Sequence, residues 1–81
     1  MMNKDEILKT INDIFIDTLD DETIVLNMET TANDVDEWDS LNHIQLIVAI
    51  EKHFKVRFTS HEIQSWKKVG EMVNSIDAKF N

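Results

Sequence analysis

The sequence predicts an all-α fold, a four-helix bundle with a long first loop and a short third helix. The 81 residues contain no proline and a single glycine, Gly70. This composition disfavours turn-rich β structure and favours helices joined by polar loops. Apolar residues recur with a helical period early, midway and late in the chain, but not over residues 20–39. The length fits a single domain over residues 1–81 with a modest core.

The first helix is expected from about Lys4 to Thr18, where apolar residues follow a helical period. Asn3 and Glu6 have the spacing of a capping box, which places the start of the helix. The residues expected to face outward are Asp5, Lys9, Asn12 and Asp13.

Residues 20–39 form an acidic connection that is rich in threonine and asparagine. A loop of this length without structure is unusual inside a small domain and is often functional. Scattered apolar residues are expected to pin it over the helices: Ile24, Leu26, Met28, Val35 and Trp38.

The second helix is predicted from about Ser40 to Lys55. Its apolar residues cover most of the circumference, so we expect it to be buried by the other helices or to line an internal space. The polar residues left to share the remaining exposed face are Asn42, His43, Gln45, Glu51, Lys52 and His53.

Two further helices complete the prediction. Thr59 or Ser60 can cap a brief third helix that ends near Ser65. A fourth helix is expected from about Lys67 to Lys79. Its residues at core spacing are Val69, Met72, Val73, Ile76 and Phe80.

Charge and composition exclude several functions. The formal charge is −8, which disfavours nucleic acid as a ligand because binding a polyanion requires clustered Lys and Arg. The absence of cysteine excludes disulfides and a cysteine nucleophile. No stretch has the apolar length of a signal peptide or a membrane span, so we expect a cytoplasmic protein. We also expect a monomer.

Ser40 is the candidate functional residue. It opens the second helix, where a hydroxyl would be exposed beside the positive end of the helix dipole. Such a position suits the attachment of a phosphate-linked group. The alternative is that Ser40, or Asp39 before it, is only a helix cap, since both residue types favour that position.

Asp39-Ser40-Leu41, followed by Ala49-Ile50-Glu51 and Phe54, resembles the acyl carrier protein family, which includes peptidyl carrier domains. The likeness extends over essentially the whole chain in the order of its helices and loop. It implies that a phosphopantetheinyl transferase esterifies Ser40 with 4′-phosphopantetheine from coenzyme A. The terminal thiol would then hold an acyl or aminoacyl group as a thioester, and the protein itself would not be catalytic.

The resemblance also implies partners and a docking surface. An acyl or aminoacyl ligase, or an acyltransferase, would load the arm, and downstream biosynthetic enzymes would use the cargo. Asp39 would help present the site to the transferase, and Leu41 would offer an apolar contact beside the arm. The second helix would dock the partners, and its expected docking residues are Asp39, Leu41, Asn42, Gln45 and Val48.

The chain departs from the carriers of primary fatty acid synthesis at two of these positions. Asn42 and Gln45 stand where those carriers commonly have acidic residues, and Lys52, His53 and Lys55 follow near the helix end. Charges at the rim of an interface act mainly on association rate and partner choice. We therefore expect a carrier for a dedicated polyketide, modified-lipid, surface-polysaccharide or aminoacyl-transfer pathway.

Other functions are weaker candidates. A small acidic helical module that binds a partner protein, with Ser40 only a cap, is the main alternative. Metal binding is disfavoured, because the histidine spacing gives no helical ligand pair and residues 34–45 do not fit an EF-hand. A catalytic role for Ser40 as a nucleophile is also disfavoured. His43 lies one turn along the helix, but no third residue is visible that would orient it. Trp38 and Trp66 are expected to anchor the loop and the third helix, with a partner for each indole N–H.

Overall fold

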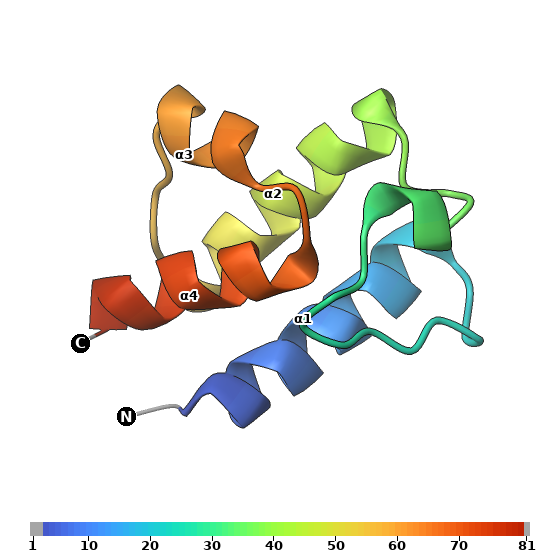
Figure 1. Ribbon diagram of the computed structural model, residues 1–81, viewed down its shortest axis with the longest axis horizontal. Helices are drawn as coiled ribbons and strands as arrows, with labels where there is room; N and C mark the ends of the chain where they lie inside the picture. The colour runs from blue at the N-terminus through green and yellow to red at the C-terminus, as the bar shows by residue number, and fades with distance from the viewer. Residues whose placement is uncertain (1–2, 81) are drawn as a thin grey trace.

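The computed structural model describes residues 3–80, and all regular secondary structure within them is helical, as predicted. Both the start of the first helix and the end of the last lie at one side of the molecule (Figure 1). The elements in chain order are α1 (Lys4–Leu19), the short 3₁₀ helix η1 (Ala32–Asp34), α2 (Ser40–Phe54), α3 (Ser60–Ser65) and α4 (Val69–Phe80). None of the helices described combines the length and apolar character that a bilayer span requires.

Local capping sets the bounds of α1. The Glu6 N–H donates to Asn3 Oδ1 (2.8 Å) and the Asn3 N–H donates to Glu6 Oε1 (3.4 Å), which completes the predicted capping box. The helix runs one residue beyond the expected end. It stops where Asp20 adopts a left-handed conformation (φ 53°), with the Asp20 N–H donating to the carbonyl of Ile16.

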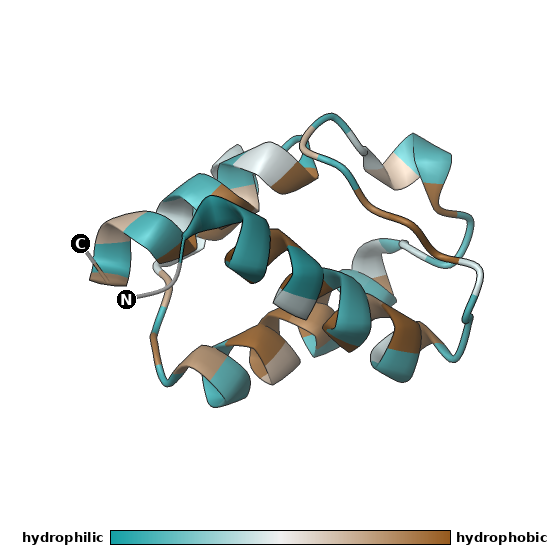
Figure 2. Ribbon diagram, turned by 90° about the horizontal axis from the view of Figure 1, so that it is seen from below, coloured by the Kyte–Doolittle hydropathy of each residue, from teal (hydrophilic) through white to brown (hydrophobic). Residues whose placement is uncertain are grey.

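The core lies between α1, α2 and α4. Figure 2 shows the hydrophilic residues of α1 turned away from the other helices, towards the viewer. On its inner face, Ile7, Ile11 and Phe15 are fully buried. The other fully buried side chains come from α2 and α4: Leu46, Ile50, Val69, Met72, Val73 and Ile76.

The long loop is fixed to α1 by Asn12, which the periodicity had wrongly placed on the outward face. Its Nδ2 donates to the carbonyl of Ile24 (3.1 Å), and the Leu26 N–H donates to Asn12 Oδ1 (2.6 Å). Ile24 and Leu26 are themselves buried, so the loop covers the core at this point. The half-buried Asn12 therefore satisfies one backbone acceptor and one backbone donor of the loop.

The same loop supplies the start of α4. The Val69 N–H donates to the carbonyl of Thr30, and the Gly70 N–H donates to the carbonyl of Met28, both at 2.9 Å. The helix begins at Val69, two residues later than predicted. A β-carbon built at Gly70 would lie 2.7 Å from the Met28 carbonyl oxygen, so this close approach requires glycine.

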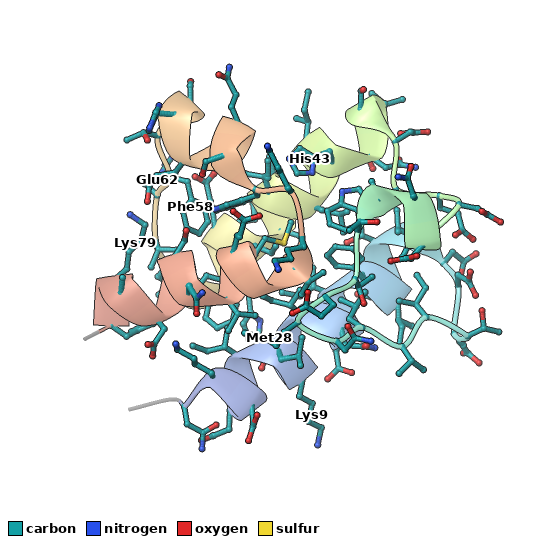
Figure 3. The ribbon with its side chains drawn as sticks, viewed as in Figure 1. Lys9, Met28, His43, Phe58, Glu62 and Lys79 are labelled. Atoms are coloured by element: carbon teal, nitrogen blue, oxygen red, sulfur yellow. The ribbon has the colours of Figure 1, made fainter. Side chains whose placement is uncertain are left out.

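The short α3 is held by aromatic and ionic contacts. Its N-cap is Thr59, one of the two residues predicted. Phe58 packs edge-on against Trp66 (4.8 Å between ring centroids), and Lys79 of α4 lies 5.3 Å from the centre of the Phe58 ring. Lys79 also pairs with Glu62 of α3 at 3.2 Å (Figure 3). Together these contacts tie α3 to the end of α4.

Two burial predictions were wrong. Helix α2 is not buried all round, because it packs mainly on α1 and the six-residue α3 is too short to cover its remaining face. Leu41, Ile44 and Val48 on that face are 69%, 62% and 46% exposed. Phe80 is 40% exposed at the end of α4, although its ring still contacts Phe54 edge-on at 6.0 Å.

Candidate functional site

The start of α2 separates the two roles that Ser40 could have. Asp39 is the N-cap: its Oδ1 accepts the Asn42 N–H at 2.8 Å. Ser40 is the first helical residue and is exposed. Its hydroxyl makes no hydrogen bond to any other residue in the range 3–80. Asp39 therefore caps the helix, and the Ser40 hydroxyl remains available for chemical modification.

Backbone groups make this helix end suitable for an anion. Asp39 occupies the N–H groups of Asn42, through its side chain, and of His43, through its carbonyl (2.8 Å). The N–H groups of Ser40 and Leu41 make no hydrogen bond within the described chain, as is usual in a first helical turn. Together with the helix dipole, they favour negative charge beside the Ser40 oxygen.

Trp38 and His43 form a fixed pair next to Ser40. The Trp38 indole N–H donates to His43 Nδ1 at 2.9 Å, and the two ring planes are inclined by 26° with centroids 6.0 Å apart. Trp38 is buried and packs edge-on against Phe15, which confirms its predicted role as an anchor. The geometry places the proton of a neutral His43 on Nε2, because Nδ1 accepts.

His43 was expected among the exposed histidines, and this was wrong. Its ring is half-buried beside Trp38, and this burial lowers the pKa of His43 below the ordinary 6.5. The side chain is therefore neutral at neutral pH and keeps one N–H to donate. Figure 3 shows His43 on α2 near the segment between α3 and α4.

An open groove of about 440 Å³ adjoins the Ser40 hydroxyl. The buried indole of Trp66 contributes to one wall, and its N–H donates to Ser75 Oγ at 2.9 Å, as expected of an anchor. Lys67 is the one cation that lines the groove. The full lining is Ala32, Trp38, Asp39, Ser40, His43, Trp66 and Lys67.

The predicted docking residues do not all lie on one accessible surface. Asp39, Leu41, Gln45 and Val48 are exposed, whereas the half-buried Asn42 donates its Nδ2 to the carbonyl of Glu37 (2.8 Å) and serves the loop. Ile44 was not among the predicted docking residues, although it is more exposed than Val48. Its position three residues after Leu41 and four before Val48 could have revealed it, since those spacings share a helix face.

The spacing of residues 34–45 disfavours a calcium site in the acidic loop. Within residues 3–80, no group of three or more His, Asp or Glu side chains is arranged to hold a metal ion. Asp21 and Glu37 instead share a hydrogen bond that raises the pKa of Glu37, while hydrogen bonds from Thr23 lower the pKa of Asp21.

The fold and this site define a class of small helical domains in which a long loop leads to an exposed serine at the start of the second long helix. Residues 9–76 match the family model described as the phosphopantetheine attachment site. The chain belongs to the acyl carrier protein family, whose members carry phosphopantetheine covalently.

Individual relatives agree with this assignment. An acyl carrier protein of Petrotoga mobilis is 34% identical over 80 residues, which cover 99% of this chain and 94% of the relative. One from Clostridium acetobutylicum is 31% identical over 72 residues, covering 89% and 94%. The solution structure of a holo acyl carrier protein from Geobacter metallireducens has a TM-score of 0.85 at 45% identity, covering 90% of this chain and 84% of that one.

Proposed function

We propose that Ser40 is the attachment residue for 4′-phosphopantetheine and that the chain is a non-catalytic carrier of acyl or aminoacyl thioesters. The observation that carries this proposal is the exposed Ser40 hydroxyl, which no described residue hydrogen-bonds while Asp39 caps the helix. A serine needed for capping would be occupied. This one can be modified with its helix left intact.

The attachment step is a transfer from coenzyme A by a phosphopantetheinyl transferase. The Ser40 oxygen attacks the phosphorus that bears the pantetheine group and forms a new O–P bond. The pyrophosphate bond to the adenosine bisphosphate half breaks, that half leaves with the electron pair, and the hydroxyl proton passes to the transferase. The product at Ser40 is a singly charged phosphodiester.

The residues around Ser40 fit this group. The N–H groups of Ser40 and Leu41 and the positive end of α2 stabilise its negative charge. Lys67, across the groove, adds a cation. His43 lines the same groove and has its Nε2–H left to donate to a carbonyl or hydroxyl of the arm. When bound, the group supplies a thiol, which the cysteine-free chain lacks.

The exposed face of α2 supports a role in partner binding. Leu41, Ile44 and Val48 form a strip, here called the apolar strip, that the other helices leave uncovered. Enzymes that load the arm or use its cargo would bury this strip while the tether brings the thioester to their active sites at high effective concentration. The neutral Gln45 beside the strip supports a dedicated pathway over primary fatty acid synthesis.

Intact mass spectrometry tests the attachment directly. The chain is co-expressed with a broad-specificity phosphopantetheinyl transferase, and we expect a mass increase equal to one phosphopantetheine. Ser40→Ala should abolish the increase. Ser60→Ala is a matched control, because Ser60 is also an exposed first residue of a helix behind a separate N-cap. It should retain the increase.

Two results would contradict the proposal. An unchanged mass with several transferases would favour the alternative of a protein-interaction module without a prosthetic group. A mass increase that survives Ser40→Ala would place the attachment at another residue.

A further inference from the structure

The C-terminal end of α2 carries a basic groove on an otherwise acidic chain. Lys52, Lys55 and Arg57 are three of the eight basic residues in the sequence, and no acidic residue lies between them. All three are exposed. An open groove of about 440 Å³ runs past them, and its lining is Val48, Glu51, Lys52, Lys55, Val56 and Arg57.

The cations of the basic groove are not used within the fold. The ion pairs found in residues 3–80 involve Lys68 and Lys79, and none involves the basic groove. The one acid in the lining, Glu51, directs a carboxylate oxygen to the Phe58 N–H (2.9 Å). The groove therefore presents a net positive surface to solvent.

Stabilisation of α2 explains only part of this arrangement. Lys52 lies in the last turn, where a cation interacts favourably with the helix dipole. Lys55 and Arg57 lie beyond the helix end. Lys55 adopts a left-handed conformation (φ 57°) and its N–H donates to the carbonyl of Glu51, which fixes the turn. This turn sets Lys55 and Arg57 beside Lys52 as a defined cluster.

The basic groove is continuous with the apolar strip, because Val48 belongs to both. Lys52 lies twelve residues after Ser40 on one helix, which corresponds to roughly 18 Å at 1.5 Å per residue. A partner that covers the strip while the tether from Ser40 enters its active site would also meet these cations.

We propose that the basic groove docks an acidic surface on the biosynthetic enzyme that loads or uses the cargo. That surface would have clustered Asp and Glu side chains roughly 18 Å from the mouth of the active site, beside an apolar recess for the strip. This inference rests on the carrier function proposed above. A protein partner is favoured over an anionic membrane, because a net charge of −8 would oppose approach to a negative lipid surface.

A charge-reversal comparison tests the inference. Lys52→Glu/Lys55→Glu removes the groove's positive charge. The matched control is Lys4→Glu/Lys9→Glu, which changes the net charge equally at two exposed lysines on α1 that form no ion pair within residues 3–80 (Lys9, Figure 3). Each protein receives on Ser40 a pantetheine analogue that ends in an electrophile. Cross-linking in lysate identifies a cognate enzyme, which is then purified.

The measured quantity is the rate of cross-linking to that purified enzyme. We expect the groove variant to react at least about tenfold more slowly than the wild type and the α1 control to stay within about twofold. Raising the salt from about 0.05 M to about 0.5 M should slow only the proteins with an intact groove. Equal rates for the two variants would overturn the proposal.

A second measurement needs no arm, so it still tests the groove if Ser40 is not modified. The ¹⁵N-labelled chain is titrated with a peptide of alternating Glu and Leu, and a Lys-Leu peptide serves as the control probe. We expect saturable shifts in residues 48–57 with the acidic peptide alone, lost in the groove variant and kept in the α1 control. Absence of these shifts would count against the proposal. Binding of the chain to phosphatidylglycerol vesicles, if it were lost in the groove variant, would also count against it. Failure of the carrier function would instead appear as an unmodified mass.

Discussion

Gly70→Ala should destabilise the protein, although alanine is normally the better residue inside a helix. Gly70 lies in the first turn of α4 and is buried. The new β-carbon would stand 2.7 Å from the Met28 carbonyl oxygen, 3.4 Å from the Met28 β-carbon and 3.5 Å from its carbonyl carbon. The first of these distances is far below van der Waals contact, and the atom in the way belongs to the backbone.

The competing terms can be compared in size. Replacing glycine by alanine in a helix contributes about 1 kcal/mol in favour of folding. Overpacking of a buried site costs about 1–3 kcal/mol. Moving Met28 away also weakens the hydrogen bonds from Val69 to Thr30 and from Gly70 to Met28, each worth about 0.5–1.5 kcal/mol. The net loss should be on the order of 1–4 kcal/mol.

Urea unfolding followed by tryptophan fluorescence and circular dichroism measures this loss. In a thermal unfolding experiment on a domain of this size, each kcal/mol of lost stability would lower Tm by roughly 4–8 °C. Asn74→Ala is the control, because Asn74 is an exposed residue of the same helix and should gain a few tenths of a kcal/mol from propensity alone. If Gly70→Ala were as stable as the wild type or more so, the contact between the loop and α4 would not have the role assigned to it.

Three further outcomes are expected. Asn12→Ala should lower the free energy of unfolding, measured with urea, by about 1–3 kcal/mol, because it leaves loop backbone groups unpaired. The control Asp13→Ala should have little effect, and equal effects of the two substitutions would contradict this role of Asn12. Ser40→Ala should cost less than Asp39→Ala, for which about 0.5–2 kcal/mol is expected, and the reverse order would make Ser40 the cap. The pKa of His43, followed by NMR, should lie below 6.5 because burial disfavours the charged ring. The stability contributed by neutral His43 is then complete above pH 6.5 and is lost as the pH falls through the pKa of the folded protein. A pKa at or above 6.5 would exclude the buried neutral form.

The starts of α1 and α3 were predictable because the signals that set them are local. The Asn3–Glu6 capping box places the start of α1 from two residues three positions apart. Thr59 was one of two candidates for the cap of α3 and proved to be the cap. These motifs depend on side chains and backbone within one turn, so no knowledge of tertiary contacts is needed.

The errors arose where a residue serves a distant part of the chain. Asn12 lies on the polar side of α1 by periodicity, and nothing nearby indicates that Ile24 and Leu26 will need its amide. The start of α4 was placed two residues early, and its first N–H groups bond to the carbonyls of Thr30 and Met28 in the distant loop. Periodicity describes the faces of one helix and does not reveal what the loop brings to it.

At the site, the position of Ser40 was predictable but its role in the helix was not. Asp39 and Ser40 are both good N-cap residues, and only the hydrogen bond from Asn42 assigns the cap to Asp39. The pairing of Trp38 with His43 could not be predicted either, since they lie five positions apart across the loop-to-helix junction. Exposure of Leu41 depended on the short length of α3, which leaves that face of α2 uncovered.

These contacts give the long loop a defined part in the proposed function. Asn12 fixes its first half to α1, and the carbonyl of Met28 ties its middle to α4. Trp38 then anchors its end in the core and holds His43, one turn along α2 from Ser40. A loop fixed at three points delivers the serine at a constant position relative to the exposed face of α2. Changes such as Asn12→Ala should therefore slow modification of Ser40 as well as lower stability, because the transferase must meet both the serine and the face beside it.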